Sequence, residues 1–242
     1  MPTDSWITAP YRRRDKPEYP HQPVGARQKQ WQPDVYIAAR ALAGQRSVSR
    51  IIDVGCGNGA KLIELATEHK TIGIDRGANL ERARTTAPSL EWRAHDLQDE
   101  GELPVTPEEL AGSLVINADV IEHLPDPKRL LAKLRALHDH VDLILLSTPE
   151  RHLTRGLRDP GPPANPAHIQ EWTTRELGAL LRASGLGSHS LGLIRSHDHS
   201  DKIATIFVAI ARSAELLAET DRLLIDLEVP PQKGGLLDRL RG

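Results

Sequence analysis

The sequence predicts an α/β protein built on a doubly wound, mostly parallel sheet. Apolar segments of strand length alternate with segments of helical periodicity between residues 35 and 211. Two strand segments, SLVINA (113–118) and VDLILLS (141–147), are continuously apolar, as expected of strands that helices cover on both faces. The chain of 242 residues is long enough for one sizeable domain of this kind with appendages.

The first predicted strand ends in a glycine-rich loop. Ile51, Ile52 and Val54 supply the apolar part of RIIDVGCGNG (50–59), and three glycines follow at alternate positions. Glycines directly after a buried strand let the backbone turn tightly and approach a ligand that a β-carbon would repel. The loop therefore predicts a cofactor site, although glycines in a strand-to-helix turn need not bind anything.

Acidic residues follow the next two predicted strands. After the helical segment KLIELATEHK (61–70), the strand TIGID ends in Asp75, where a carboxylate can accept both hydroxyls of a ribose. A third strand at 90–93 is followed by Asp96 and Leu97, a polar group beside an apolar one that together could hold an adenine. The alternative is that Asp75 and Asp96 only cap the ends of their strands.

Composition narrows the class of protein. The net charge of −2 and a pI near 6.6 provide no bulk attraction to polyanions, so nucleic acid is a disfavoured partner. The single cysteine, Cys56, lies in the glycine loop and rules out a disulfide framework, which favours a reducing cytoplasm. Apolar runs are all shorter than a membrane span. We therefore expect a soluble, cytoplasmic protein.

The two ends of the chain differ from the predicted core. Residues 1–34 are rich in proline, arginine and aromatic residues, which suits an extended arm that covers a substrate cleft or simply lies on the surface. The core is assigned to residues 35–211. Residues 212–242 begin with leucines at helical spacing, so we expect a C-terminal helix that packs on the body or on a second subunit of a homodimer.

A group of metal-ligand residues follows the fourth predicted strand. If the segment after this strand is helical, Asp119, Glu122 and His123 fall on one face, because offsets of three and four are neighbours on a helix. Two carboxylates and an imidazole suit Mg²⁺, Mn²⁺ or Zn²⁺. The alternative is that Glu122 and His123 only shape an acceptor pocket.

The long segment after the fifth predicted strand supplies a fourth ligand. Residues 147–172 are rich in glycine and proline and longer than an ordinary connection, which predicts a functional loop. His168 lies in this loop, just before Thr173, which we expect to cap the next helix. Glu150 is an alternative ligand, and His123, His168 and Glu150 are candidate proton acceptors. A second polar cluster, His197 to His199, is either a metal site or an exposed loop.

The glycine loop and the residues around it resemble the class I S-adenosylmethionine-dependent methyltransferases. Their first motif is an acidic residue followed by GxGxG, as Asp53 and the three glycines stand here, and this spacing differs from the dinucleotide fingerprint GxGxxG. The resemblance covers residues 31–210 and implies a seven-stranded Rossmann-like sheet whose antiparallel edge comes from the segments 187–195 and 202–210. By this resemblance the cofactor-binding residues are Asp53, Gly55, Cys56, Gly57, Gly59, Asp75, Arg76, Asp96, Leu97, Asn117 and Ala118.

The metal-ligand pattern resembles narrower groups within this family. An acidic residue, two spacers, Glu-His and a later His before EWT look like the metal-dependent small-RNA terminal 2′-O-methyltransferases, and the first part also resembles the ubiquinone-pathway O-methyltransferases. The resemblance implies the ligands Asp119, Glu122, His123 and His168, with aspartate at 119 in place of the usual glutamate. The segment GPPANPAHIQEW is similar to that of actinobacterial methyltransferases of glycan synthesis, including methylmannose polysaccharide assembly.

These resemblances predict metal-dependent O-methylation of a vicinal diol. A divalent metal can chelate two adjacent hydroxyls and lower the pKa of the attacking one. A sugar or oligosaccharide, for example a mannoside, fits the polar, proline-rich loop better than a prenylated catechol, and the charge disfavours an RNA 3′ end. A protein of this fold that binds the cofactor but lacks catalysis, and serves as a partner subunit, is the non-enzyme alternative.

Overall fold

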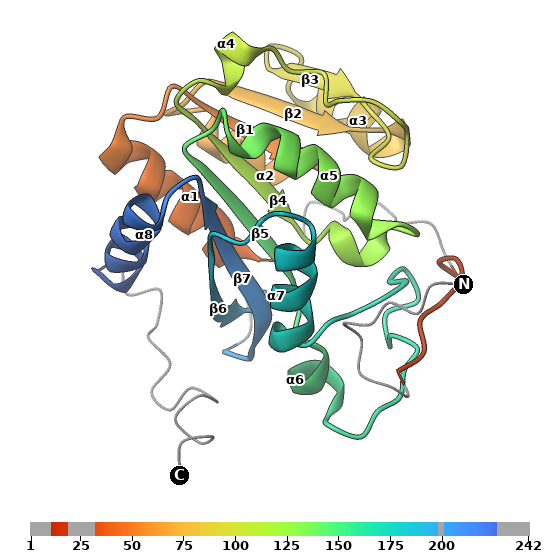
Figure 1. The fold of residues 1–242 in the computed structure, drawn as a ribbon. Coiled ribbons are helices and arrows are strands. Elements are labelled where there is room, and N and C mark those ends of the chain that lie inside the picture. The colour runs from red at the N-terminus through yellow and green to blue at the C-terminus, as the bar shows by residue number, and fades with distance from the viewer. Residues whose placement is uncertain (1–10, 19–31, 198–200, 227–242) are drawn as a thin grey trace.

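The computed structural model describes residues 11–18, 32–197 and 201–226, and these contain a seven-stranded sheet flanked by helices (Figure 1). The strand order is β3-β2-β1-β4-β5-β7-β6, which confirms the predicted doubly wound, mostly parallel fold. The strands are β1 Arg50–Val54, β2 Thr71–Asp75, β3 Glu91–Ala94, β4 Ser113–Ala118, β5 Leu143–Pro149, β6 His189–Arg195 and β7 Ile203–Ala211.

The predicted antiparallel edge of the sheet is confirmed. The last strand along the chain, β7, lies between β5 and β6 and runs antiparallel to both. Its pairing with β5 extends from Leu143↔Ala211 to Pro149↔Thr205. Because of this long pairing, β5 extends to Pro149, two residues beyond the end of the predicted segment 141–147.

Helices cover both faces of the sheet (Figure 1). Apolar residues of α5 and α7 pack on one face, and those of α1, α2 and α8 pack on the other. The helices are α1 Pro33–Arg46, α2 Ala60–Leu65, α3 Gly77–Thr86, α4 Pro107–Leu110, the 3₁₀ helix η1 Ile121–His123, α5 Pro127–His138, α6 Arg151–Arg155, α7 Thr174–Ala183 and α8 Ala214–Asp226. The described helices include none that is long and apolar enough to cross a membrane.

Alternate residues of the central strands belong to different apolar cores. Ile52 of β1 and Val115 of β4 are fully buried on the α5 side, whereas Ile51 and Leu114 are fully buried on the α1 side. Because successive strand side chains point to opposite faces, a strand covered on both faces is apolar at most of its positions. This explains the continuous apolar runs of the sequence.

Side chains near the helix ends set where the helices begin and end. The predicted cap of α7 is confirmed, since Thr173 Oγ1 accepts from Glu176 N–H and the Glu176 carboxylate accepts from Thr173 N–H. The helix after the glycine loop is shorter than predicted and ends at Leu65. The Thr67 hydroxyl there donates to Glu64 O at 2.9 Å, a local bond that competes with helix continuation.

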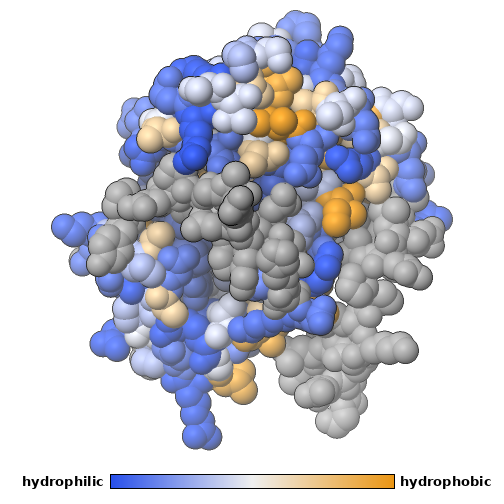
Figure 2. All heavy atoms as spheres, turned by 180° about the vertical axis from the view of Figure 1, so that it is seen from behind, coloured by the Kyte–Doolittle hydropathy of each residue, from blue (hydrophilic) through white to orange (hydrophobic). Residues whose placement is uncertain are grey.

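The C-terminal end of the described chain packs against α1. The predicted C-terminal helix exists as α8, and the Arg46 guanidinium at the end of α1 donates to Leu216 O at 3.1 Å and to Thr220 Oγ1 at 2.9 Å. The predicted boundary at residue 34 falls in the first turn of α1. Hydrophilic residues dominate the face shown in Figure 2. A homodimer through the C-terminal tail stays a prediction, and residues 227–242 of that tail lie outside the described residues.

Candidate active site

The glycine loop after β1 has the conformation and the packing that require glycine. Gly55, Gly57 and Gly59 have φ angles of 83°, 60° and 75°, which side-chain-bearing residues rarely adopt. A β-carbon on Gly55 would lie 2.5 Å from Val120 Cγ2, and one on Gly59 would lie 2.3 Å from Trp92 Cη2. At Gly57 no described atom lies within 4 Å of that position, so the backbone faces open space that a ligand can occupy.

Asp75 at the end of β2 fixes this loop. Its Oδ2 accepts from Gly57 N–H at 2.7 Å, and its Oδ1 accepts from Arg76 N–H at 2.7 Å. Each carboxylate oxygen can accept a second hydrogen bond, so this placement is compatible with the predicted ribose contact. Asp75 therefore has a structural contact besides its expected role in binding.

The predicted adenine residues lie after β3. Asp96 Oδ1 accepts from Gln98 N–H at 2.9 Å, and Asp96 Oδ2 lies 3.3 Å from Arg76 Nε. Leu97 is buried in the apolar core on the α5 side of the sheet. The Arg76 side chain is 69% exposed, so this ion pair lies at the surface and holds Asp96 only weakly.

Asp53 is a buried carboxyl group beneath the loop. The Tyr36 hydroxyl of α1 donates to Asp53 Oδ2 at 2.9 Å, and Lys61 Nζ of α2 lies 4.4 Å from the centre of the Tyr36 ring. Burial raises the pKa of Asp53 to about 7, against the opposing effects of Lys61 and Tyr36. Asp53 Oδ1 is buried and has no hydrogen-bond partner in the described part of the chain.

The end of β4 provides the floor of this site. Asn117 Nδ2 donates to Val54 O at 2.7 Å, which ties the ends of β4 and β1 together. Asn117 Oδ1 is a second buried acceptor for which the described residues supply no donor. Ala118 and Cys56 are buried beside it, and burial raises the pKa of the Cys56 thiol. The residues that the sequence assigned to the cofactor thus line one edge of the sheet.

The structure brings together three of the four predicted metal ligands. Ligand atoms of Glu122, His123 and His168 all lie within 4.8 Å of one another, although His168 comes from the loop after α6. The two imidazole rings meet edge to face with their centres 4.8 Å apart. Glu122 Oε1 is buried and lacks a hydrogen-bond partner among the residues described. This donor set fits a divalent cation.

Neighbouring groups orient these three side chains. His123 Nδ1 lies 2.9 Å from Ala167 O, and His168 Nδ1 lies 2.7 Å from Glu171 Oε1. With Nδ1–H donating to these oxygens, each ring presents Nε2 as its ligand atom, the arrangement common to metal-bound histidines. His168 Nε2 accepts from Asn165 Nδ2 at 2.8 Å, so the Asn165 amide would have to move for this nitrogen to bind a metal.

Asp119 does not belong to this group of three. The predicted helical turn after β4 is interrupted, because Asp119 has a left-handed φ of 55° and η1 begins only at Ile121. The Asp119 carboxyl still lies within hydrogen-bonding reach of Glu122. Burial and this neighbour raise the pKa of Asp119 well above its usual value, and burial raises that of Glu122 to about 7. Two buried carboxyls in contact require a shared proton or a cation.

Comparison with known proteins identifies the family. A family model described as a methyltransferase domain matches residues 26–191. The chain belongs to the class I S-adenosylmethionine-dependent methyltransferases. The order of the seven strands and the glycine loop after β1 agree with this assignment.

Relatives of this methyltransferase occur in mycobacteria. A probable S-adenosylmethionine-dependent methyltransferase of Mycolicibacterium smegmatis is 28% identical over 62% of this chain and 56% of its own length. One of Mycobacterium tuberculosis is 30% identical over 62% of this chain and 53% of its own length. The chain thus spans about half the length of the curated relatives it matches.

A solved structure has the same fold as this methyltransferase. The N-terminal domain of EvdMO1, crystallised with S-adenosylhomocysteine bound, aligns with a TM-score of 0.52 and 21% identity. The alignment covers 75% of this chain and 82% of that one. At this level of identity the likeness establishes the fold.

Glu150, the alternative ligand and proton acceptor, caps two helices of the methyltransferase. Its Oε2 accepts from Leu153 N–H at 2.8 Å in α6, and its Oε1 accepts from Thr174 N–H at 3.1 Å in α7. The side chain is buried and does not belong to the group of three ligands. We therefore assign Glu150 to the support of the loop between α6 and α7. Asp198 and His199 of the second polar cluster lie outside the described residues.

Sequence reasoning missed several residues of the candidate site. Tyr36 of α1 donates to Asp53 of the first motif, Lys61 of α2 lies over the Tyr36 ring, and Thr148 Oγ1 of β5 donates to Glu122 Oε2 at 2.8 Å. Glu171 and Asn165 flank His168. The spacing of three between His168 and Glu171 was the available clue, whereas the other contacts join distant segments.

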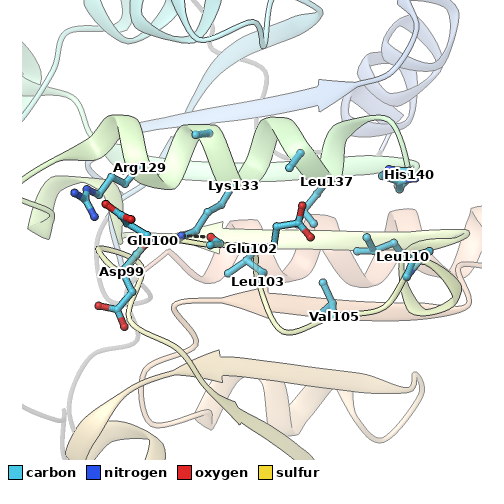
Figure 3. Close-up of a pocket in the computed structure, with 14 residues that line it drawn as sticks. Asp99, Glu100, Glu102, Leu103, Val105, Leu110, Arg129, Lys133, Leu137 and His140 are labelled. Carbon is cyan, nitrogen blue, oxygen red and sulfur yellow. Dashed lines mark hydrogen bonds between the residues drawn. The ribbon is translucent and has the colours of Figure 1, made fainter.

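The methyltransferase also has a hollow outside this site, between α5 and the segment 99–110 (Figure 3). Its volume is 390 Å³, and none of the predicted site residues lines it. Lys133 Nζ in its wall donates to Asp99 O at 2.8 Å and to Gly101 O at 2.6 Å. These bonds tie the segment to α5, so the hollow is explained by the packing of a loop on a helix.

Proposed function

We propose that this methyltransferase transfers the methyl group of S-adenosylmethionine to a hydroxyl of a sugar or oligosaccharide, assisted by a divalent metal. The observation that carries the proposal is the group of Glu122, His123 and His168, whose ligand atoms lie within 4.8 Å of one another. Val120, two residues before Glu122, packs against Gly55. A ligand on the loop and a ligand on the three side chains would therefore be neighbours.

The cofactor would bind along the edge formed by β1, β2 and β4. The sulfonium cofactor carries an ammonium group, which suits the buried acceptors Asp53 Oδ1 and Asn117 Oδ1. Asp75 would accept from the ribose hydroxyls, and Asp96 with Leu97 would contact the adenine. The open space at Gly57 gives the backbone side of the site room for the ligand.

The metal would be held by Glu122, His123 and His168, with Asp119 as a further ligand from the adjacent carboxyl. When bound, a divalent ion supplies Lewis acidity that lowers the pKa of a coordinated hydroxyl. Oxygen and nitrogen ligands of this kind accept Mg²⁺ as well as Mn²⁺. Thr148 and Glu171 would orient Glu122 and His168 for this role.

The reaction exchanges one bond for another. The acceptor oxygen forms a bond to the methyl carbon while the carbon–sulfur bond breaks, which leaves the neutral thioether S-adenosylhomocysteine. The acceptor must also lose its hydroxyl proton. His168 is the better oriented of the two imidazoles for this role, because Glu171 Oε1 lies 2.7 Å from its Nδ1 and fixes the ring. An imidazole that binds a metal does not accept the proton at the same time, so these are alternative roles of His168.

A sugar is the acceptor that the surroundings favour. A vicinal diol can present two adjacent oxygens to one metal, and sugars, catechols and RNA 3′ ends all carry one. The segment 156–172, which contains His168, is rich in proline and polar residues, whereas a prenyl tail would need an apolar channel. The net charge of −2 disfavours RNA.

The proposal is tested by methyl transfer from labelled S-adenosylmethionine to short mannosides, other glycosides, RNA 3′ ends and catechols, each with Mg²⁺ or EDTA. We expect labelling of a glycoside that EDTA abolishes. Labelling that ignores EDTA would contradict the metal, and labelling of RNA or catechol alone would contradict the acceptor class. Binding of S-adenosylhomocysteine without any transfer would favour a non-catalytic partner subunit.

His168→Ala separates the site from the rest of the fold. We expect it to retain S-adenosylhomocysteine binding and to lose at least about 100-fold in turnover, the scale of one general acid–base contribution. His140→Ala is the matched control, because His140 is exposed and lies just after the end of α5. Equal turnover of the two variants would remove His168 from the mechanism.

A further inference from the structure

Residues 11–18 form a strap across the loop that carries His168. Figure 1 shows this segment beside the chain that follows α6. Three strap amides donate to loop carbonyls: Arg12 to Pro160 at 2.6 Å, Arg14 to Ile169 at 2.9 Å and Glu18 to Pro166 at 2.9 Å. The contacts join segments that lie about 150 positions apart in the sequence.

Arg14 is the centre of the strap. Its Nη1 donates to Pro163 O at 2.6 Å, to Asn165 O at 3.2 Å and to His168 O at 3.2 Å. Its Nε donates to Glu18 Oε1 at 2.9 Å, and the side chain is only 13% exposed. One guanidinium thus gathers three carbonyls of the loop, including that of His168 itself.

Tyr11 anchors the other end of the strap near the partner of His168. The Tyr11 hydroxyl accepts from Glu171 N–H at 3.0 Å, and the Arg151 guanidinium lies 4.0 Å from the centre of the Tyr11 ring. Arg151 is buried and forms an ion pair with Glu176 at 2.8 Å. The strap therefore holds both His168 and the Glu171 that orients its ring.

The loop depends on such contacts because it has little structure of its own. Residues 156–173 connect α6 to α7 without a helix or a strand. Buried backbone carbonyls require donors, and a helix or sheet does not supply them here. At Gly161 the approach is so close that a β-carbon would lie 2.4 Å from Arg12 O. Strap and loop are thus packed as one unit.

We propose that Arg14 is a positioning residue that fixes His168 and thereby sets the affinity of the Glu122–His123–His168 group for a divalent cation. This rests on the proposed metal-assisted function and deepens it. For residues 11–18 the proposed role is support of the loop that carries His168, and the role of the N-terminal arm as a substrate cover stays a prediction. Without the Arg14 side chain, the loop that carries His168 would no longer hold this residue in its present geometry. The glycine loop and the cofactor site would be unaffected.

The test compares Arg14→Ala with Arg13→Ala in the full chain. Arg13 is exposed and adjacent, so its variant has the same net charge and nearly the same sequence. Mn²⁺ binding is measured by calorimetry and electron paramagnetic resonance, S-adenosylhomocysteine binding by calorimetry, and loop protection by amide hydrogen exchange. For Arg14→Ala we expect about 10- to 100-fold weaker Mn²⁺ binding, as for loss of an outer partner of a metal ligand. Cofactor affinity should be unchanged, and Arg13→Ala should match the wild type.

A conservative variant separates charge from geometry. Arg14→Lys keeps the positive charge but replaces the planar fork by one ammonium group, so we expect Mn²⁺ affinity between those of the wild type and Arg14→Ala. Amides of residues 163–170 should exchange faster in Arg14→Ala than in Arg13→Ala.

Three outcomes would overturn the inference. The first is unchanged Mn²⁺ affinity in Arg14→Ala, and the second is an equal loss of cofactor affinity, which indicates general destabilisation. If the wild type itself binds no Mn²⁺, the metal-assisted part of the proposed function is contradicted. The hydrogen-exchange comparison then tests whether Arg14 positions His168. Faster exchange confined to the loop supports the positioning of His168, and unchanged exchange overturns it.

Discussion

Thr148 and Glu122 are joined by a 2.8 Å hydrogen bond from the threonine hydroxyl to the carboxylate, although they belong to β5 and η1. Both residues are fully buried. The bond fixes Oε2 of the Glu122 carboxylate, whereas Oε1 is buried and has no hydrogen-bond partner among the described residues. The end of a central strand thus orients a residue of the candidate metal site.

Thr148→Val should weaken the metal site without disturbing the cofactor site. Valine has the shape of threonine but no hydroxyl, so Glu122 loses its donor. We expect about 10- to 100-fold weaker Mn²⁺ binding, with S-adenosylhomocysteine affinity unchanged, measured by calorimetry. Thr148→Ser keeps the hydroxyl and should bind Mn²⁺ like the wild type. Equal affinities in the valine and serine variants would show that the bond has no role in metal binding.

Asp75→Ala should weaken cofactor binding. The carboxylate fixes Gly57 and is the expected acceptor of the ribose hydroxyls, so its loss removes two kinds of contact. We expect about 10- to 100-fold weaker S-adenosylhomocysteine binding in calorimetry, which is about 1.4 to 2.7 kcal/mol. Asp75→Asn retains one acceptor oxygen and should fall between. Glu100→Ala, an exposed carboxylate change beside α5, is the control. Undiminished affinity in Asp75→Ala would refute the ribose assignment.

Asp53→Asn should stabilise the cofactor-free protein at neutral pH. The folded pKa of Asp53 is about 7 against an ordinary value of 3.8, so the unfolded chain releases this proton at lower pH. The free energy of unfolding of the wild type, relative to that of the variant, should therefore fall by about 2 to 4 kcal/mol in total as the pH rises from 4 to 7. Above pH 7 the difference should stay level.

Thermal unfolding of both proteins at several pH values measures this difference. Asp201→Asn, a change at an exposed position, should shift stability by less than about 0.5 kcal/mol at every pH. A constant difference between Asp53→Asn and the wild type from pH 4 to 8 would show that the buried carboxyl does not titrate as described.

Gly59→Ala should destabilise the fold, because the new β-carbon would meet Trp92 at 2.3 Å and the backbone φ is 75°. We expect a loss of about 2 to 4 kcal/mol in denaturant unfolding, from the left-handed conformation and the overpacking together. Gly44→Ala is the matched change. Gly44 lies exposed in α1, with no described atom near its β-carbon position. Alanine at this position should therefore raise the free energy of unfolding by about 0.5 to 1 kcal/mol. Similar stabilities of the two variants would contradict the tight packing of the glycine loop.

The sheet could be predicted from local pattern where the strands are central. The predicted segment SLVINA (113–118) corresponds residue for residue to β4, and all six of its residues are buried because both faces of that strand are covered. The end of β5 at Pro149 could not be predicted in the same way. It depends on pairing with Thr205 of β7, more than fifty positions further along the chain.

The candidate site could be predicted only in its local part. The neighbouring residues Glu122 and His123 predicted a metal group. His168, shortly before the Thr173 cap, predicted that the long loop supplies a further ligand. The left-handed turn at Asp119 was hidden, since aspartate is compatible with helix and turn alike. The contact of Arg14 with the His168 carbonyl has no local pattern, because it depends on how two distant irregular segments cross.

The place of β7 in the sheet has a consequence for synthesis of the protein. Because β7 separates β5 from β6, the ribosome must release the chain beyond Ala211 before the sheet can close. Until then β5 has an open edge, and the cap residue Glu150 lacks the backbone bond from its N–H to Ala204 O. The nascent chain therefore exposes an unpaired apolar strand, and chains that stop before β7 should be held by chaperones or aggregate.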